Sequence, residues 1–191
     1  MKIGIIPTVT EKNKSIYYSI NKSLLTFLNK LFNKPKIKVL NDFNVELCDL
    51  IVSSGGNDLL KFSKQKKDKE RAKIENYYLN LAIKKNIKFL AICYGAQFLA
   101  FKFGGKLTLD QNHVAKNHFI FSKNENKFLV NSFHNYKIIK ISKKFNILFK
   151  SEDGSIEAFR HKEKGILGIM WHPERYKKIK KFDVKFIKKY L

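Results

Sequence analysis

The chain has 191 residues, of which 44% are hydrophobic, so it is long enough to bury a sizeable core and is not of the disordered class. It holds no run of roughly 18–20 apolar residues, as a membrane-spanning helix requires, and no signal peptide is evident at its N-terminus. Its two cysteines, Cys48 and Cys93, cannot form a disulfide framework. These features predict a cytoplasmic protein with a single domain over residues 1–191.

The charge is strongly positive, because 39 Lys and Arg residues face 16 Asp and Glu residues, which gives +23 at pH 7. Such an excess indicates an anionic ligand. It also fits AT-rich codons, which encode Lys, Asn, Ile and Phe, so both interpretations stay open. Only three of the basic residues are Arg, the residue that nucleic-acid-binding proteins use for bidentate contacts. The composition therefore argues against a nucleic-acid partner.

The first half of the chain alternates apolar strands with helices. Strands are predicted at residues 2–6, 37–40, 47–53 and 87–92. Helices are predicted at residues 15–32, 70–85 and 96–103, and residues 62–73 are expected at the surface. The second half has short strand signals at residues 118–121, 127–130, 147–150, 155–160 and 166–171, then an amphipathic helix at residues 178–190. This order predicts an α/β fold, with a mostly parallel central sheet flanked by helices and extra antiparallel strands in the second half.

A candidate nucleophile lies in residues 91–97 (Ala-Ile-Cys-Tyr-Gly-Ala-Gln), where a buried strand meets a helix. A sharp strand-to-helix turn lifts such a side chain out of the sheet, so we expect Cys93 to be exposed. The free N–H groups of the following helix would favour a thiolate. The alternative is that Cys93 is a small buried hydrophobic residue.

A candidate base lies in residues 170–174 (Met-Trp-His-Pro-Glu), at the end of an apolar strand. His172 and Glu174 are two residues apart, so on an extended backbone their side chains point to the same side. A cysteine nucleophile needs a base, and the base needs a group that fixes its tautomer. Together with Cys93, this pair predicts a catalytic triad.

Residues 54–57 (Ser-Gly-Gly-Asn) follow the third strand and predict a loop that approaches a ligand closely. Its backbone N–H groups can form half of an oxyanion hole. The N–H of Tyr94, directly after the nucleophile, would supply the other half.

These motifs, in this order, resemble the class I glutamine amidotransferases. More closely, they resemble the single-domain γ-glutamyl hydrolase branch, which includes the γ-glutamyl-γ-aminobutyrate hydrolases. The resemblance extends over about residues 1–190 and implies a flavodoxin-like sheet. Three further segments contribute to it: residues 71–75 (Arg-Ala-Lys-Ile-Glu, with Ala where the branch has Asp), 130–134 (Val-Asn-Ser-Phe-His) and 153–158 (Asp-Gly-Ser-Ile-Glu-Ala).

The resemblance implies roles for individual residues. Cys93 would be the nucleophile, His172 the base and Glu174 the group that orients it, while Gly56 and Tyr94 would supply the oxyanion-hole amides. The substrate would be bound by Gly55, Asn57, Gln97, Ser132, Phe133 and His134. Two positions depart from the family pattern, since Ala91 replaces a Gly and Tyr136 replaces a Gln. No metal or cofactor is expected, because His113, His118 and His161 do not form a metal-binding pattern.

The activity implied by the resemblance is hydrolysis of a γ-glutamyl amide through a thioester, with release of glutamate. One member type of the branch hydrolyses γ-glutamyl-CDP-amidate for capsule decoration, and the cationic composition favours such an anionic, nucleotide-linked substrate. Two alternatives are a glutaminase subunit that delivers ammonia to a separate synthetase and a γ-glutamyl-γ-aminobutyrate-type hydrolase. A binding module with a relict site and a nucleic-acid binder are more distant alternatives. The oligomeric state is left open.

Overall fold

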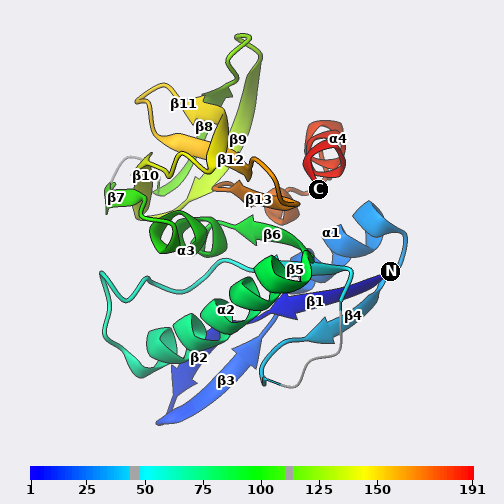
Figure 1. Cartoon of the computed structure of the whole chain (residues 1–191), viewed down its shortest axis with the longest axis vertical. Coiled ribbons are helices and arrows are strands. Elements are labelled where there is room, and N and C mark those ends of the chain that lie inside the picture. Colours follow the sequence, from blue (N-terminus) through cyan, green and yellow to red (C-terminus); the bar gives the residue numbers. More distant parts are fainter. Residues whose placement is uncertain (44–47, 111–113) are drawn as a thin grey trace.

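The computed structural model describes residues 1–43, 48–110 and 114–191. Its largest sheet has nine strands among these residues, in the order β4-β1-β5-β6-β13-β12-β11-β8-β9 (Figure 1). The first five run parallel: β4 (Lys36–Val39), β1 (Lys2–Ile6), β5 (Leu50–Ser53), β6 (Lys88–Ile92) and β13 (Ile166–Ile169). The others pair antiparallel: β12 (Ile156–His161), β11 (Phe145–Ser151), β8 (Val114–Phe121) and β9 (Lys127–Phe133). The predicted fold class is therefore confirmed, including the antiparallel second half.

Helices cover both faces of the parallel strands. On one face, α1 (Lys22–Phe32) and α4 (Lys181–Tyr190) bury apolar side chains against strand residues such as Ile5, Leu90 and Ile169. On the other face, α2 (Lys66–Lys85) and α3 (Tyr94–Lys102) pack against residues such as Ile51 and Phe89. A strand buried on both faces has no polar side, which explains the continuous apolar run in β6.

The predicted helix over residues 15–32 is wrong in its first part. Residues Ser15–Ser19 form strand β3, which pairs with β2 (Thr8–Lys12) across a two-residue turn at Asn13 and Lys14. Both turn residues have positive φ, at 50° and 63°, as in the turn types whose twist suits a hairpin. Helix α1 begins only at Lys22, because the Asn21 side chain accepts a hydrogen bond from the N–H of Ser23 and caps it.

Other boundaries differ less. Helix α2 begins at Lys66 rather than residue 70, and α3 begins at Tyr94 rather than residue 96. A separate two-stranded sheet of β7 (Lys106–Leu109) and β10 (Tyr136–Lys140) has no counterpart in the predicted elements. Residue 47, the predicted start of the third strand, lies outside the described residues.

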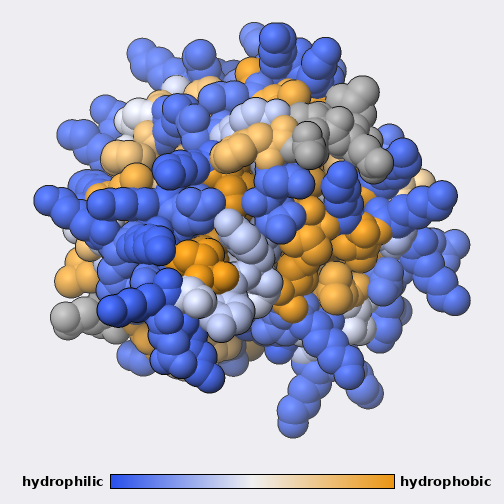
Figure 2. All heavy atoms as spheres, turned by 90° about the horizontal axis from the view of Figure 1, so that it is seen from below, coloured by the Kyte–Doolittle hydropathy of each residue, from blue (hydrophilic) through white to orange (hydrophobic). Residues whose placement is uncertain are grey.

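The charged residues are largely at the surface, but residues 62–73, which were expected there, include the fully buried Asp68 and Arg71. Figure 2 shows one face of the molecule, on which hydrophilic residues predominate and hydrophobic residues form smaller patches between them. Among the described residues, no helix is long and apolar enough to span a membrane.

The end of β13 is tied to α4 by a buried acid. The indole N–H of Trp171 donates to Asp183 at 2.8 Å, and burial raises the pKa of Asp183 to about 6. Because this pKa exceeds the ordinary value of 3.8, the charge costs folding free energy as the pH rises from about 4 to above 6. We expect Asp183→Asn to raise the melting temperature by several degrees at pH 8, and by little near pH 4.

Asp153 supplies a control of opposite sign. Burial opposes its charge, but hydrogen bonds from Lys137, Ser151 and Ser155 hold its pKa below the ordinary range. Asp153→Asn should therefore lower the melting temperature at pH 8. Equal shifts for the two variants at both pH values, measured by calorimetry, would contradict this assignment of the Asp183 charge.

Candidate active site

Cys93 lies on the turn between β6 and α3. Its backbone has φ 51° and ψ −100°, a conformation that non-glycine residues rarely adopt and that concentrates at functional sites. A Cβ added at Gly95 would collide with the Ser53 side chain and lie 3.0 Å from the Ser53 carbonyl, so the turn requires glycine there. The predicted sharp turn is confirmed, but the predicted exposure is wrong, because Cys93 is buried, with only 7% of the residue exposed.

His172 and Glu174 lie at the other side of this turn. The Nδ1 atom of His172 lies 2.5 Å from Oε1 of Glu174, and the His172 ring also hydrogen-bonds to the Cys93 side chain. Burial by itself would lower the pKa of His172. The negative charge on Cys93 and the hydrogen bonds to Cys93 and Glu174 outweigh burial and raise this pKa to about 9. The structure thus brings the three predicted triad residues together, and the raised pKa of His172 keeps its ring protonated at neutral pH.

Asn131 fixes the backbone of His172. Its Oδ1 accepts from the N–H of His172 and its Nδ2 donates to the carbonyl of His172, both at 2.8 Å. The hydroxyl of Tyr176 accepts from the N–H of Asn131 at 3.0 Å. The sequence showed Asn131 only as part of a motif, without a role, because its partner is 41 residues away.

The glycine loop packs directly against the triad. A Cβ added at Gly55 would lie 2.6 Å from Cε1 of His172, so glycine is needed for this approach. The hydroxyl of Thr8 donates to the carbonyl of Gly55 at 2.8 Å. In a trans peptide the carbonyl and the following N–H point in opposite directions. Because Thr8 binds the carbonyl of Gly55, the N–H of Gly56 points away from Thr8. Gly56 has φ +107°, and an added Cβ would meet Thr8 at 2.9 Å.

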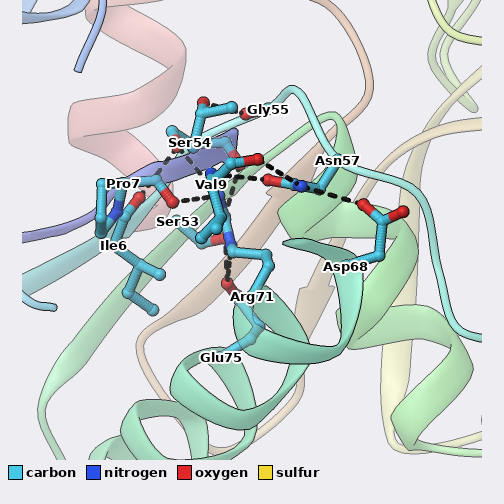
Figure 3. A network of polar contacts seen from close by, with 11 residues as sticks. Ile6, Pro7, Val9, Ser53, Ser54, Gly55, Asn57, Asp68, Arg71 and Glu75 are labelled. Atoms are coloured by element: carbon cyan, nitrogen blue, oxygen red, sulfur yellow. Dashed lines mark hydrogen bonds and ion pairs between the residues drawn. The ribbon is translucent and has the colours of Figure 1, made fainter. Parts of the chain in front are cut away.

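Arg71 holds this loop from behind (Figure 3). Its guanidinium is fully buried and donates to the carbonyls of Pro7 at 2.6 Å and Ser54 at 2.7 Å. Glu75, one turn along α2, lies 3.0 Å from it. The guanidinium also lies 4.6 Å from the centre of the Tyr94 ring. One side chain therefore braces both the glycine loop and the residue after Cys93, a role that residues 71–75 did not reveal as a sequence motif.

A conservative change of Arg71 tests this role. Arg71→Lys keeps the positive charge but removes the planar guanidinium, whose several N–H groups bind different acceptors at once. The glycine loop and Tyr94 should therefore shift. We expect kcat to fall about 100-fold with KM nearly unchanged, because the change would displace the predicted oxyanion donors of Gly56 and Tyr94, which would stabilise the transition state rather than the bound substrate. Arg160→Lys, on β12, is the matched control and should change kcat less than about twofold. A larger change in KM than in kcat would contradict a positioning role.

Two predicted substrate-binding residues have their side chains engaged within the protein. The amide of Asn57 accepts from the N–H of Val9 and donates to the Val9 carbonyl and to Asp68, each at 2.9 Å. It thereby anchors β2. Nε2 of Gln97 donates to the carbonyl of Tyr136 at 3.3 Å, and Gln97 is buried.

The remaining predicted residues lie at the end of β9. Phe133 is exposed, and its ring centre lies 5.7 Å from that of His172. Ser132 and His134 are buried, and Nε2 of His134 lies 3.8 Å from Oε1 of Glu157. The structure therefore brings Phe133 directly to the triad. The contacts of these three residues with substrate stay predictions.

A crevice of about 250 Å³ lies beside His172 and Glu174. Its lining combines the glycine loop, the base of the β2–β3 hairpin, the start of α1 and the segment that carries the histidine: Thr8, Ser19, Asn21, Leu24, Ser54, Gly55, Gly56, His172, Glu174 and Arg175. Within the described part of the chain, no three His, Cys, Asp or Glu residues are placed to hold a metal ion.

The class I glutamine amidotransferase family matches residues 14–189 of the chain. The chain belongs to this family. It is 36% identical over 169 residues to a γ-glutamyl-CDP-amidate hydrolase from Campylobacter jejuni, with 83% of this chain and 84% of the relative covered. It is also 28% identical over 159 residues to a subunit of the glutamine-hydrolysing GMP synthase from Methanococcus vannielii, with 76% and 77% covered.

The fold agrees with the family. A solved structure from Thermoplasma acidophilum, assigned as a GMP synthase subunit, superposes with a TM-score of 0.74 at 19% identity, over 100% of this chain and 92% of that one. The family resemblance expected from the three motifs is therefore confirmed, and the chain is an amide-hydrolysing enzyme of this family.

Proposed function

We propose that this chain hydrolyses γ-glutamyl-CDP-amidate to glutamate and cytidine diphosphoramidate, a step that would serve capsule decoration. The observation that carries the proposal is the 36% identity to the Campylobacter jejuni hydrolase of that name over most of both chains. The arrangement of Cys93, His172 and Glu174 supports the chemistry, because a nucleophile, a base and an orienting carboxylate form one hydrogen-bonded chain.

The reaction begins with attack of the Cys93 thiolate on the γ-carbonyl carbon, which forms a C–S bond and an oxyanion. The N–H groups of Gly56 and Tyr94 hold that oxyanion. The His172 imidazolium gives its proton to the leaving nitrogen as the C–N bond breaks. His172 then takes a proton from water, and the resulting hydroxide attacks the thioester. The C–S bond breaks, glutamate leaves, and the thiolate and imidazolium are restored.

A second candidate is a glutaminase that supplies ammonia to a synthetase, which the similarity to the GMP synthase of Methanococcus vannielii favours. Release of glutamate from γ-glutamyl-CDP-amidate, glutamine and γ-glutamyl-γ-aminobutyrate distinguishes the candidates. We expect the highest kcat/KM for the nucleotide-linked substrate. Preference for glutamine would favour the glutaminase, and preference for γ-glutamyl-γ-aminobutyrate would favour that hydrolase type.

The pH profile gives a test of the imidazolium. Because the pKa of His172 is raised to about 9, its proton is present at neutral pH and is lost as the pH rises through that value. We expect kcat/KM to fall on the alkaline side with an apparent pKa near 9. In Glu174→Gln this limb should move to lower pH, since one group that stabilises the imidazolium is lost. An unchanged limb in the variant would contradict the role of Glu174.

A further inference from the structure

A second cavity adjoins the catalytic crevice. It has a volume of about 330 Å³ and shares Glu174 with the crevice. Consecutive residues line the two spaces, since Arg175 faces the crevice and Tyr176 faces the cavity. One side of α1, from its first turn to its last, and the segment that begins at Glu174 form its walls: Lys22, Ser23, Thr26, Phe27, Lys30, Glu174, Tyr176, Lys177 and Ile179. The two spaces together have the size of a small-molecule site.

The charge of this cavity is positive. Lys22 and Lys30 come from α1, and Lys177 faces them from the segment after the triad. Among the described residues of the lining, the single acid is Glu174, and its Oε1 is bound to His172. Tyr176 and Ile179 are half-buried and add apolar surface. Such a lining, cationic with an aromatic and an aliphatic wall, suits an anion that carries a flat organic group.

Arg175 lines the crevice, next in the chain to Tyr176, which lines this cavity. Its guanidinium lies 4.6 Å from the ring centre of Phe133, and that ring contacts His172. In a γ-glutamyl amidate, the nitrogen that His172 protonates is bonded to phosphorus. The phosphate must therefore lie beside His172, within reach of Arg175, whose guanidinium can donate two hydrogen bonds to a phosphate.

We infer that this cavity is the subsite for the leaving group, with a nucleoside diphosphate bound by Lys22, Lys30 and Lys177 and its first phosphate met by Arg175. The inference rests on the proposed function, because it assigns the γ-glutamyl group to the Cys93 side of His172. It also gives part of the excess positive charge a specific use.

A triple variant tests the subsite. Lys22→Ala, Lys30→Ala and Lys177→Ala together remove three positive charges from the cavity. We expect the ratio of kcat/KM for γ-glutamyl-CDP-amidate to kcat/KM for the neutral γ-glutamyl-p-nitroanilide to fall about tenfold, as three modest ionic contacts would give. The matched control replaces Lys84, Lys85 and Lys188, which are exposed and lie outside both cavities, and should leave the ratio unchanged.

A binding measurement separates this inference from the proposed function. Calorimetry with the Cys93→Ala protein should show CDP binding that weakens about tenfold in the cavity variant but not in the control variant. Cytidine and pyrophosphate, as separate probes, show which part of the ligand is held. Absent CDP binding, or equal losses in both triple variants, would overturn the subsite. If the wild type released glutamate from none of the γ-glutamyl amides, the proposed function would be overturned instead.

Discussion

Replacing Cys93 with Ala should abolish release of glutamate from γ-glutamyl-CDP-amidate, with a loss of several orders of magnitude in kcat. The reason is that the Sγ atom is the attacking group, and the Cys93 side chain is hydrogen-bonded to the ring of His172. The fold should persist, because the change is small and Ala meets the same backbone strain at φ 51° as Cys does. A coupled assay for glutamate, with thermal unfolding on the same samples, measures both effects.

Cys48 provides the matched control. It is also buried, at 9% exposure, and packs beside Gly4 on β1, away from the triad. Cys48→Ala should keep kcat within about twofold of the wild type, even if it lowers stability by about 1 kcal/mol through lost packing. Substantial turnover by Cys93→Ala would show that the cysteine at the turn has only a structural role.

Replacing His172 with Ala should lower kcat by several orders of magnitude, since both proton transfers pass through this ring. Glu174→Gln should lower kcat by a smaller factor than His172→Ala does. An amide still occupies the position 2.5 Å from Nδ1, but it does not stabilise the imidazolium as a carboxylate does. Rates at pH 7 for both variants, compared in single-turnover experiments, test this order.

A histidine elsewhere gives the control for these losses. His161 lies at the end of β12 among Phe103 and Phe145, and it lines a different cavity. His161→Ala should leave kcat nearly unchanged. If Glu174→Gln were slower than His172→Ala, the assignment of base and orienting group would have to be exchanged.

The parts of the site that the sequence predicted are those carried by short segments. The turn at Cys93 and the pair of His172 and Glu174 each depend on residues that lie within a few positions of one another. The spacing within these segments therefore indicates a nucleophile, and a base with its orienting carboxylate. The prediction that Cys93 is exposed is wrong because residues that lie against it, Gly55 and His172, come from distant segments of the chain.

The hairpin was missed for a different reason. The apolar residues Ile16, Ile20 and Leu24 have the spacing of a helical face, although the first of them lies in a strand. The turn at Asn13 and Lys14 has no glycine, so the usual signal for a two-residue hairpin is absent. The pairing with β2 decides that residues 15–19 form a strand rather than a helix.

The connections of Arg71 also bear on how the enzyme acquires activity as it folds. The carbonyls that it binds belong to residues 64 and 17 positions earlier in the chain. Such long-range closures cost chain entropy and are slow to form compared with local helix contacts. Activity during refolding should consequently return with the slowest phase that docks α2 onto the sheet, later than the helical circular dichroism signal.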